Sequence, residues 1–239
     1  MPRSWDEVAA LRRDQIESGL DITFSRVFVP YFAGLLSRRK PKFVLEIGGG
    51  TGHLAKELVR YCERYVMLEP SRGMCEVARA TLSNTGVELH NCSIEELTSE
   101  QEFDCVLSHL CLQGIPDLLS FVHAMASKLS DKGTLVASLP HPAFYNDYKK
   151  FFPESSFRYK TEISAMVSFN VTLDPHRPIE GVPYHHRPIS SYISAFSNVD
   201  VCISDFYEVT PSPEIEALYG APWQTPRYLV LFGRLCRGV

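Results

Sequence analysis

An acidic residue and a run of glycines carry the first recognisable chemistry in this sequence. Glu46 precedes the segment Gly48-Gly49-Gly50-Thr51-Gly52 by two positions. Glycine lets the main chain turn sharply and lets a ligand approach the backbone closely. A carboxylate beside such a turn attracts a cationic ligand and repels a phosphate. The segment is therefore expected to bind a ligand that carries positive charge.

A second acid, Glu69, ends the next expected strand, where its carboxylate can accept hydrogen bonds from both hydroxyls of a ribose. Glu69 therefore indicates a nucleotide that contains ribose, but it does not discriminate among such nucleotides. The segment Gly50-Thr51-Gly52-His53-Leu54-Ala55 matches the dinucleotide pattern GxGxxG/A, but that match leaves Gly48 and Gly49 unexplained. S-adenosylmethionine fits better, because it carries an ammonium, a carboxylate and a sulfonium but no phosphate. Glu46 would face its cationic end, and amides of the turn would face its carboxylate.

Strands and helices alternate along the chain and position these residues. Strands are expected at 43–47, 65–68, 87–90, 103–108 and 134–139, with helices at 53–61, 74–82 and 118–129 between them. A helix at 189–196 and strands at 199–209 and 227–234 complete the pattern. This rhythm predicts an α/β fold with a mostly parallel, seven-stranded sheet and helices on both faces. Because ligands bind beyond the carboxyl ends of such strands, the glycine turn, Glu69, Ser93 and Ser108 are expected along one rim.

A single compact domain is expected. Residues 1–40 show apolar spacings typical of helices and are expected to form an N-terminal cover. Residues 41–239 are expected to form the nucleotide-binding domain, in which the regular alternation breaks at 141–187. That segment is rich in aromatic residues and prolines, and we expect it to be an insertion that forms a lid over the site.

Composition limits the class of protein. Of the 239 residues, 45% are apolar and 22% are charged, which is ordinary for a globular protein. The net charge of −4, and the lack of an apolar run near the roughly 20 residues of a membrane helix, argue against nucleic acid and membranes as partners. Seven cysteines without a CxxC pair predict a reducing compartment, no disulfide framework and no metal site. Charged residues within 1–7 replace the apolar block of a signal peptide, so a cytoplasmic location is expected.

Together these motifs resemble those of the class I S-adenosylmethionine-dependent methyltransferases. The first motif of that superfamily is matched by residues 46–52, the second by 68–74, the fourth-strand motif by 103–108 and the fifth-strand entry by 132–135. The resemblance implies a Rossmann-like fold with S-adenosylmethionine as the cofactor. The cofactor-binding residues that it implies are Glu46, Gly48, Gly49, Gly50, Gly52, Glu69, Pro70, Met74, Ser93, Ile94 and Ser108. Where the family often has an acid for the adenine amine, this chain has Ser93.

A looser resemblance concerns the methyl acceptor. The segments 138–142 and 184–188 are similar to stretches of bacterial small-molecule methyltransferases. Methyl transfer is an in-line displacement, and an acceptor hydroxyl or ammonium also needs a base, for which histidine is suited near neutral pH. The candidate catalytic residues are His141, His109 and Tyr184. The candidate substrate-binding residues are Tyr145, His186 and Arg187.

Each of these candidates has a plainer interpretation. A histidine or tyrosine there could equally be a hydrogen-bonded residue on a loop or cavity wall. Arg187 could clamp a substrate carboxylate through two hydrogen bonds, or it could hold the lid through a salt bridge.

The sequence therefore predicts methyl transfer to oxygen or nitrogen of a small-molecule acceptor, in biosynthesis and specifically in specialised metabolism. One alternative is an enzyme of the same fold that closes the methionyl chain into a ring and releases methylthioadenosine. Others are a non-catalytic cofactor-binding partner protein and, last, an NAD oxidoreductase. Ser108-His109-Leu110-Cys111 stands where DNA methyltransferases have their Asn/Asp-Pro-Pro-Tyr/Phe motif, which argues against that class. The acceptor and the oligomeric state stay open.

Overall fold

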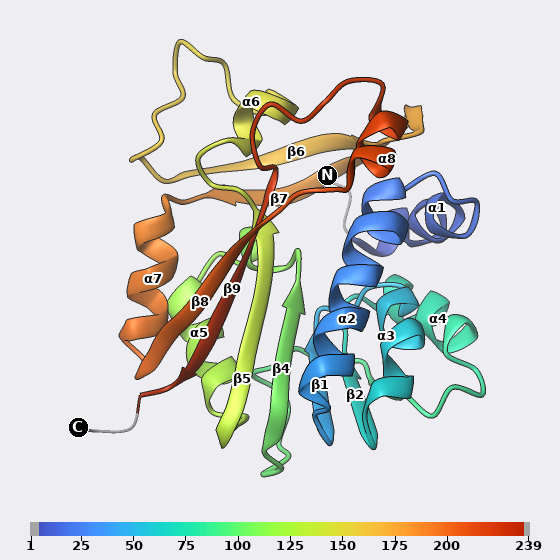
Figure 1. The fold of residues 1–239 in the computed structure, drawn as a ribbon, viewed down its shortest axis with the longest axis vertical. Coiled ribbons are helices and arrows are strands. Elements are labelled where there is room, and N and C mark those ends of the chain that lie inside the picture. Colours follow the sequence, from blue (N-terminus) through green and yellow to red (C-terminus); the bar gives the residue numbers. More distant parts are fainter. Residues whose placement is uncertain (1–4, 237–239) are drawn as a thin grey trace.

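A seven-stranded sheet forms the centre of the computed structural model, which describes residues 5–236 (Figure 1). The strand order is β3-β2-β1-β4-β5-β9-β8. The strands are β1 (Phe43–Ile47), β2 (Arg64–Leu68), β3 (Glu88–His90), β4 (Phe103–His109), β5 (Leu129–Pro140), β8 (Val201–Val209) and β9 (Tyr228–Leu235). β1 to β5 pair in parallel, whereas β9 runs antiparallel to both β5 and β8. The predicted α/β fold and mostly parallel sheet are confirmed.

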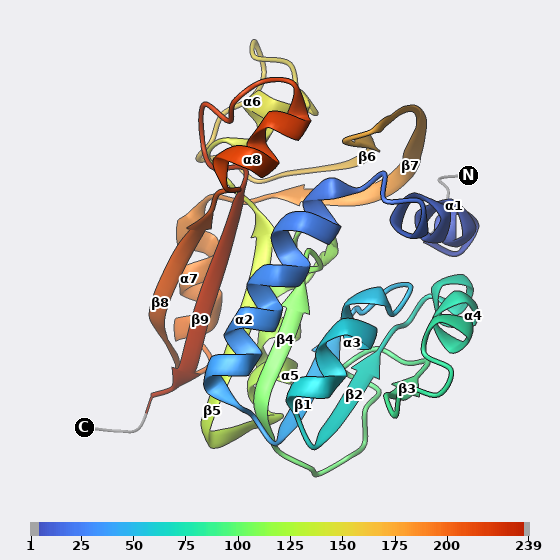
Figure 2. The same cartoon turned by 45° about the vertical axis from the view of Figure 1, so that its right-hand side comes forward.

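Helices cover both faces of this sheet (Figure 2). Successive residues of β1, Val44 and Leu45, are both fully buried but belong to opposite hydrophobic clusters. Burial on both faces explains the continuous apolar runs that predicted the parallel strands. One cluster contains α2 (Val29–Arg39), α3 (His53–Leu58) and α4 (Arg72–Thr81), and the other contains α5 (Leu118–Ala126) and α7 (Ile189–Ser197).

The segment between β5 and α7 lies beyond the carboxyl ends of the strands (Figures 1 and 2). It contains α6 (Tyr145–Lys149) and an antiparallel hairpin of β6 (Ile163–Val171) and β7 (Asp174–His186), which form a separate two-stranded sheet. The sequence analysis expected an insertion here but no strands. Pro175, Pro178 and Pro183 interrupt the strand pattern of β7, and the pairing register shifts on both sides of Phe169.

Within the described part of residues 1–40, the two α-helices have different positions. α2 lies on the sheet, where Phe32 is fully buried in the core. α1 (Trp5–Glu17) instead connects α4 to the hairpin, because Asp6 Oδ1 accepts hydrogen bonds from Ser71 Oγ at 2.6 Å and Gly73 N at 2.8 Å. At its other end, Gln15 Nε2 donates to Asp174 Oδ2 at 3.1 Å. Residues 1–4 of the predicted cover lie outside the described residues.

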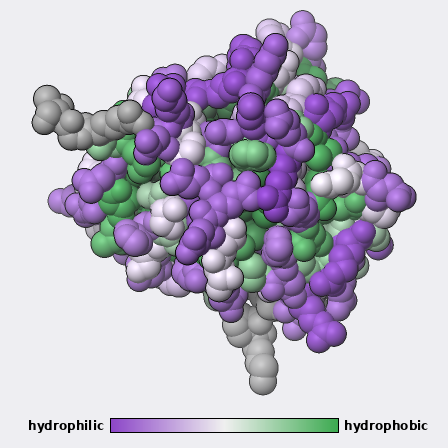
Figure 3. All heavy atoms as spheres, turned by 90° about the horizontal axis from the view of Figure 1, so that it is seen from below, coloured by the Kyte–Doolittle hydropathy of each residue, from purple (hydrophilic) through white to green (hydrophobic). Residues whose placement is uncertain are grey.

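The C-terminal part of the chain closes the edge of the sheet. α8 (Pro213–Glu216) lies between β8 and β9, above the strands (Figure 1). Short helical turns occur at 23–28, 59–61, 112–114 and 217–219. Seen from the amino ends of the parallel strands, hydrophilic and hydrophobic residues are intermingled on the surface (Figure 3). Within 5–236, no helix combines the length and the apolar character that crossing a membrane requires.

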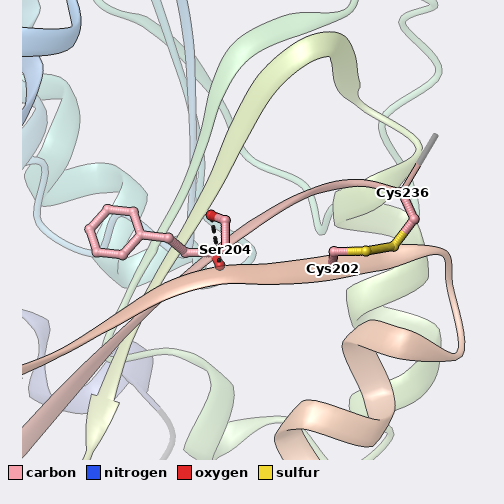
Figure 4. Close-up of a disulfide and its surroundings, with 4 residues drawn as sticks. Cys202, Ser204 and Cys236 are labelled. Carbon is pink, nitrogen blue, oxygen red and sulfur yellow. Dashed lines mark hydrogen bonds between the residues drawn. A yellow bond between two sulfur atoms is a disulfide. The ribbon is translucent and has the colours of Figure 1, made fainter.

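A disulfide joins Cys202 of β8 to Cys236, which follows β9 (Figure 4). Beside it, Ser204 Oγ donates a hydrogen bond to Phe232 O at 3.4 Å. The expectation that the cysteines form no disulfide is therefore corrected. Their spacing gave no sign of the pair, since the two residues are 34 positions apart and become neighbours only through the antiparallel pairing of β8 with β9.

The bridge leads to a prediction about stability. Under oxidising conditions, Cys236→Ser should lower the free energy of unfolding by about 3 kcal/mol, because the bridge limits the freedom of the unfolded chain over a 34-residue separation. Urea unfolding with and without excess dithiothreitol measures this. The reductant should destabilise the wild type but not Cys236→Ser, and Cys62→Ser, which removes a free thiol, should behave as wild type. A wild type unaffected by the reductant would contradict the bridge.

Candidate active site

One cavity of about 510 Å³ lies beyond the carboxyl ends of β1, β2, β4 and β5. Its wall at one end is the glycine turn after β1 and the residues after β2 and β3. Its other end lies under α1, α6 and the β6–β7 hairpin. Of the predicted cofactor residues, nine line the cavity: Glu46, Gly48, Gly49, Gly50, Glu69, Pro70, Met74, Ser93 and Ile94.

The glycine turn needs glycine for two different reasons. Gly48 and Gly50 have φ angles of +70° and +58°, in the left-handed region that side chains disfavour. Gly49 lies against β2, and a Cβ there would be 2.6 Å from Met67 Cγ. A Cβ on Gly50 would meet nothing within 4 Å. The backbone at Gly50 is thus open to a ligand in the cavity.

Glu69 is held in place by the backbone around it. Its Oε2 accepts a hydrogen bond from Gly50 N at 2.7 Å, and its Oε1 accepts one from Ser71 N at 2.8 Å. The residue is only 6% exposed, and burial raises the pKa of its carboxyl group against the opposing effect of these two bonds. A carboxylate has about four acceptor positions, so Glu69 keeps capacity for ligand hydroxyls.

Glu46 is more deeply buried, at 1% exposure, on the floor of the same end of the cavity. Its Oε2 accepts a hydrogen bond from Tyr65 Oη at 2.9 Å. Burial raises the pKa of Glu46 to about 7, although the Tyr65 hydrogen bond opposes the shift and the charge of Glu69 adds to it. A cation bound beside Glu46 would stabilise its ionised form.

Two predicted cofactor residues do not line the cavity. Gly52 has a φ of +78° and is the N-cap of α3, where an added Cβ would lie 3.0 Å from the Leu82 side chain. Ser108 is fully buried in β4 opposite Ile47 of β1. The predicted cofactor contacts of Gly52 and Ser108 stay predictions. Glu95, which the sequence analysis did not select, lines the cavity beside Ser93 and Ile94.

Aromatic side chains form the other end of the cavity. Tyr145 and Tyr184 both line it, as predicted, and their ring centroids are 6.4 Å apart. The Phe151 ring lies 5.0 Å from Tyr184, and the Tyr228 ring lies 5.5 Å from Tyr145. Burial raises the pKa of Tyr145 and of Tyr184 far above the usual range. Both phenols therefore stay protonated and act as hydrogen-bond donors and acceptors.

His109 is the predicted histidine that reaches this cavity. Its Nδ1 is hydrogen-bonded to Ser138 Oγ at 2.7 Å. Its ring centroid lies 4.4 Å from that of Phe28 and 5.3 Å from that of Phe32. Burial among these rings lowers its pKa to about 3, so the imidazole is neutral at physiological pH.

His141 is not among the residues that line the cavity, and its role as a catalytic base stays a prediction. Its Nε2 lies 3.1 Å from Glu208 Oε1, and its Nδ1 accepts a hydrogen bond from Ala143 N at 3.2 Å. Both ring nitrogens therefore have protein partners. The turn after β5 sets the direction of this side chain, and the strand pattern alone did not reveal that turn.

His186 and Arg187 also lie outside the cavity lining, and their substrate contacts stay a prediction. His186 Nε2 is 2.8 Å from Tyr159 O. Arg187 Nη2 donates to the carbonyl oxygens of Ile115 and Pro116 at 2.7 and 2.8 Å. Arg187 thus ties the end of the hairpin to the loop after β4 through these carbonyl groups. Its Nε also lies 3.8 Å from Glu162 Oε2, in line with the salt-bridge alternative of the sequence analysis.

Several cavity residues had no recognisable signal in the sequence. Arg12 and Asp21, whose Nη2 and Oδ2 atoms are 2.6 Å apart, come from the N-terminal segment, and Lys149 and Asn170 come from the insertion. Each reaches the cavity only because distant segments fold over it. Among residues 5–236, no group of three or more His, Cys, Asp or Glu could hold a metal ion.

Residues 45–137 match the family model of the methyltransferase domain. Over 120 residues the chain is 32% identical to malonyl-[acyl-carrier protein] O-methyltransferase of Acetivibrio thermocellus, covering 49% of this chain and 40% of that protein. It is 32% identical over 99 residues to ubiquinone biosynthesis O-methyltransferase of Xanthomonas campestris pv. campestris, covering 40% and 41%. The chain thus spans about two-fifths of the length of the curated relatives it matches.

Solved structures share the fold over a longer stretch. An S-adenosylmethionine-dependent methyltransferase from Clostridium acetobutylicum has a TM-score of 0.66 at 13% identity, covering 97% of this chain and 98% of that one. Another from Mesorhizobium loti has a TM-score of 0.62 at 22% identity, covering 81% and 90%. The resemblance found in the motifs is therefore confirmed: residues 45–137 match a methyltransferase domain, and the chain shares its fold with S-adenosylmethionine-dependent methyltransferases.

Proposed function

We propose that this protein transfers a methyl group from S-adenosylmethionine to an oxygen or nitrogen of a small molecule. The observation that carries the proposal is one continuous cavity, which connects the two buried carboxylates and the glycine turn to an aromatic chamber under the insertion. Its volume of about 510 Å³ lies in the ordinary range for small-molecule sites. A methyl donor and an acceptor held in one enclosed space can react in line while water is excluded.

The cofactor end suits S-adenosylmethionine in its charge. Glu46 and Glu69 place two carboxylates on either side of the glycine turn, which favours a positively charged nucleoside over a diphosphate. Glu69 would hold the ribose hydroxyls and Glu46 the cationic methionine end. Pro70, Met74 and Ile94 would hold the adenine ring. The bound cofactor supplies an electrophilic methyl group on a sulfonium.

At the acceptor end, His109 is the residue best placed to hold a reacting hydroxyl or amine. Because Nδ1 is engaged by Ser138, Nε2 is the ring nitrogen that remains for the acceptor. With its low pKa this imidazole orients the acceptor through a hydrogen bond and is a weak base. Tyr145 and Tyr184 would contribute apolar surface and neutral hydroxyl groups.

Small-molecule biosynthesis, with specialised metabolism as the setting, is the context that we propose. The relatives that support small-molecule biosynthesis are named for methyl transfer to malonyl-[acyl-carrier protein] and in ubiquinone biosynthesis. A ribosomal RNA methyltransferase of Mycoplasma mycoides also matches, but over only 28% of this chain, and the net charge of −4 favours a small acceptor over RNA. The cytoplasmic location stays a prediction. The Cys202–Cys236 bridge argues against it, because disulfides persist mainly in oxidising compartments.

The first prediction concerns cofactor affinity. Glu69→Gln should weaken binding of S-adenosylhomocysteine about tenfold to a hundredfold, because hydrogen bonds to a charged acceptor contribute about 1.5–3 kcal/mol. The new amide would also oppose the donors Gly50 N and Ser71 N. Calorimetry measures the affinity, and Glu76→Gln, an exposed residue of α4, is the matched control. Equal affinity in wild type and Glu69→Gln would contradict the assignment.

The reaction itself is tested by its products. Incubation with S-adenosylmethionine and a library of small hydroxyl and amine compounds should yield S-adenosylhomocysteine and a product heavier by one methylene unit. Release of methylthioadenosine instead would overturn methyl transfer in favour of attack on another carbon of the cofactor.

A further prediction concerns pH. Because the pKa of Glu46 is raised to about 7, affinity for S-adenosylhomocysteine should fall as the pH falls below about 7 and the carboxyl group becomes protonated. In Glu46→Gln the affinity should be weak and should lose this dependence. A pKa raised from 4.5 to about 7 in the folded state also means that stability is lost as the pH rises from 4.5 to about 7 and stays low above that range, so Glu46→Gln should stabilise the free protein at alkaline pH. Calorimetry and thermal unfolding across the pH range measure both effects.

A further inference from the structure

The aromatic end of the cavity contains a cation that methyl transfer itself does not require. Lys149, the last residue of α6, lines the cavity. Its Nζ donates a hydrogen bond to Asn170 O of β6 at 2.7 Å. The same Nζ lies 4.6 Å from the ring centroid of Tyr148 and 5.9 Å from that of Phe169. Its surroundings are therefore a carbonyl group and two aromatic faces.

Lys149 forms no ion pair within residues 5–236. A buried or half-buried ammonium group without a counter-ion is costly, because carbonyl groups and ring faces replace only part of its hydration. Burial lowers the pKa of Lys149 to about 8, while the charge of Asp21 raises it and that of Arg227 lowers it. The shift is in the direction expected for a cation that lacks a close anionic partner.

The nearby acid is already engaged. Asp21 Oδ2 lies 2.6 Å from Arg12 Nη2, and Asp21 Oδ1 accepts a hydrogen bond from Phe24 N at 2.9 Å. Arg12 Nη1 is buried and has no hydrogen-bond partner within the described residues. The polar groups at this end of the cavity thus include one paired acid, the partly satisfied Arg12 and the unpaired Lys149.

From this arrangement we propose that the methyl acceptor carries a carboxylate, which pairs with Lys149 while its apolar body packs among the aromatic rings of the chamber. The inference rests on the proposed function and specifies its substrate class. Tyr145, Phe151 and Tyr184 would contact the apolar body. A single negative charge fits better than a phosphate dianion, because Asp21 would repel the second charge.

The position of Lys149 also orients such an acceptor. α6 follows β5, whereas the glycine turn follows β1, and β4 lies between these two strands in the sheet. A carboxylate held at Lys149 therefore leaves the opposite end of the molecule to reach toward the cofactor end. The carboxylate is an anchor in this proposal, and a different atom receives the methyl group.

The test uses two probes of nearly the same shape, 2-naphthoate and 2-naphthamide, which differ in charge. Their dissociation constants would be measured by ligand-observed NMR in the presence of saturating S-adenosylhomocysteine. The proteins are wild type, Lys149→Met, Lys149→Arg and the control Lys150→Met, which removes the adjacent exposed lysine that pairs with Glu154.

The wild type and Lys150→Met should bind 2-naphthoate about tenfold more tightly than 2-naphthamide, a ratio that corresponds to about 1.4 kcal/mol. Lys149→Met should remove this ratio while it keeps affinity for 2-naphthamide, and Lys149→Arg should restore it. If Lys149 only tied α6 to β6, Lys149→Met would weaken both probes equally and leave the ratio unchanged. That result would overturn the proposal. Equal binding of both probes by the wild type, or no binding of 2-naphthoate, would also overturn it.

Calorimetry with S-adenosylhomocysteine distinguishes a failure of the carboxylate anchor from a failure of the proposed methyl transfer. Tight binding of S-adenosylhomocysteine by the wild type and by Lys149→Met, together with the loss of the probe ratio in the variant, supports the acceptor assignment. Tight binding of S-adenosylhomocysteine without any probe ratio in the wild type refutes the carboxylate anchor and leaves the proposed function standing. No binding of S-adenosylhomocysteine refutes the proposed function first.

Discussion

A carboxyl group buried beside an open stretch of backbone is the constraint on which the rest of this molecule depends. Glu46 is almost fully buried, and Tyr65 from the adjacent strand donates its hydroxyl hydrogen to it. Burial of an acid is costly unless hydrogen bonds or a counter-ion compensate. Tyr65 supplies one hydrogen bond, and a cationic ligand would supply the charge. A buried carboxylate at this position is therefore costly in the free protein and is stabilised when a cation binds beside it.

The parallel sheet makes this arrangement possible. β1 and β2 are adjacent and end at the same level, so the turn after β1 and the acid after β2 meet, and Gly50 N donates directly to Glu69. The acceptor end has a different origin. It is assembled from α1, α6 and the hairpin; Gln15 bonds α1 to the hairpin, and Arg187 bonds the hairpin to the loop after β4. The cofactor end is therefore fixed by the sheet, and the acceptor end by added segments.

This difference explains what could be predicted from the sequence. Buried parallel strands are short apolar runs bounded by turns, so β1, β2 and β4 were predicted within one residue at each end. That nine of the selected residues line one end of the cavity could be predicted because most of them follow those strands closely. The aromatic end of the cavity could not be predicted in this way, since Arg12 and Lys149 look like ordinary surface charges until distant segments fold together. The direction of His141 depends on contacts with Ala143 N and Glu208 Oε1, which no spacing in the sequence encodes.

The β6–β7 hairpin shares no backbone ladder with the central sheet, because it forms a two-stranded sheet of its own. The methyltransferase family model likewise ends at residue 137, before the hairpin begins. Exchange or remodelling of 141–187 would therefore leave the strand pairing and the Glu46–Glu69 end untouched while it replaced the walls around the acceptor. Because these two parts are separate, changes in a single contiguous stretch of the chain could alter the acceptor while the nucleotide-binding sheet stays the same.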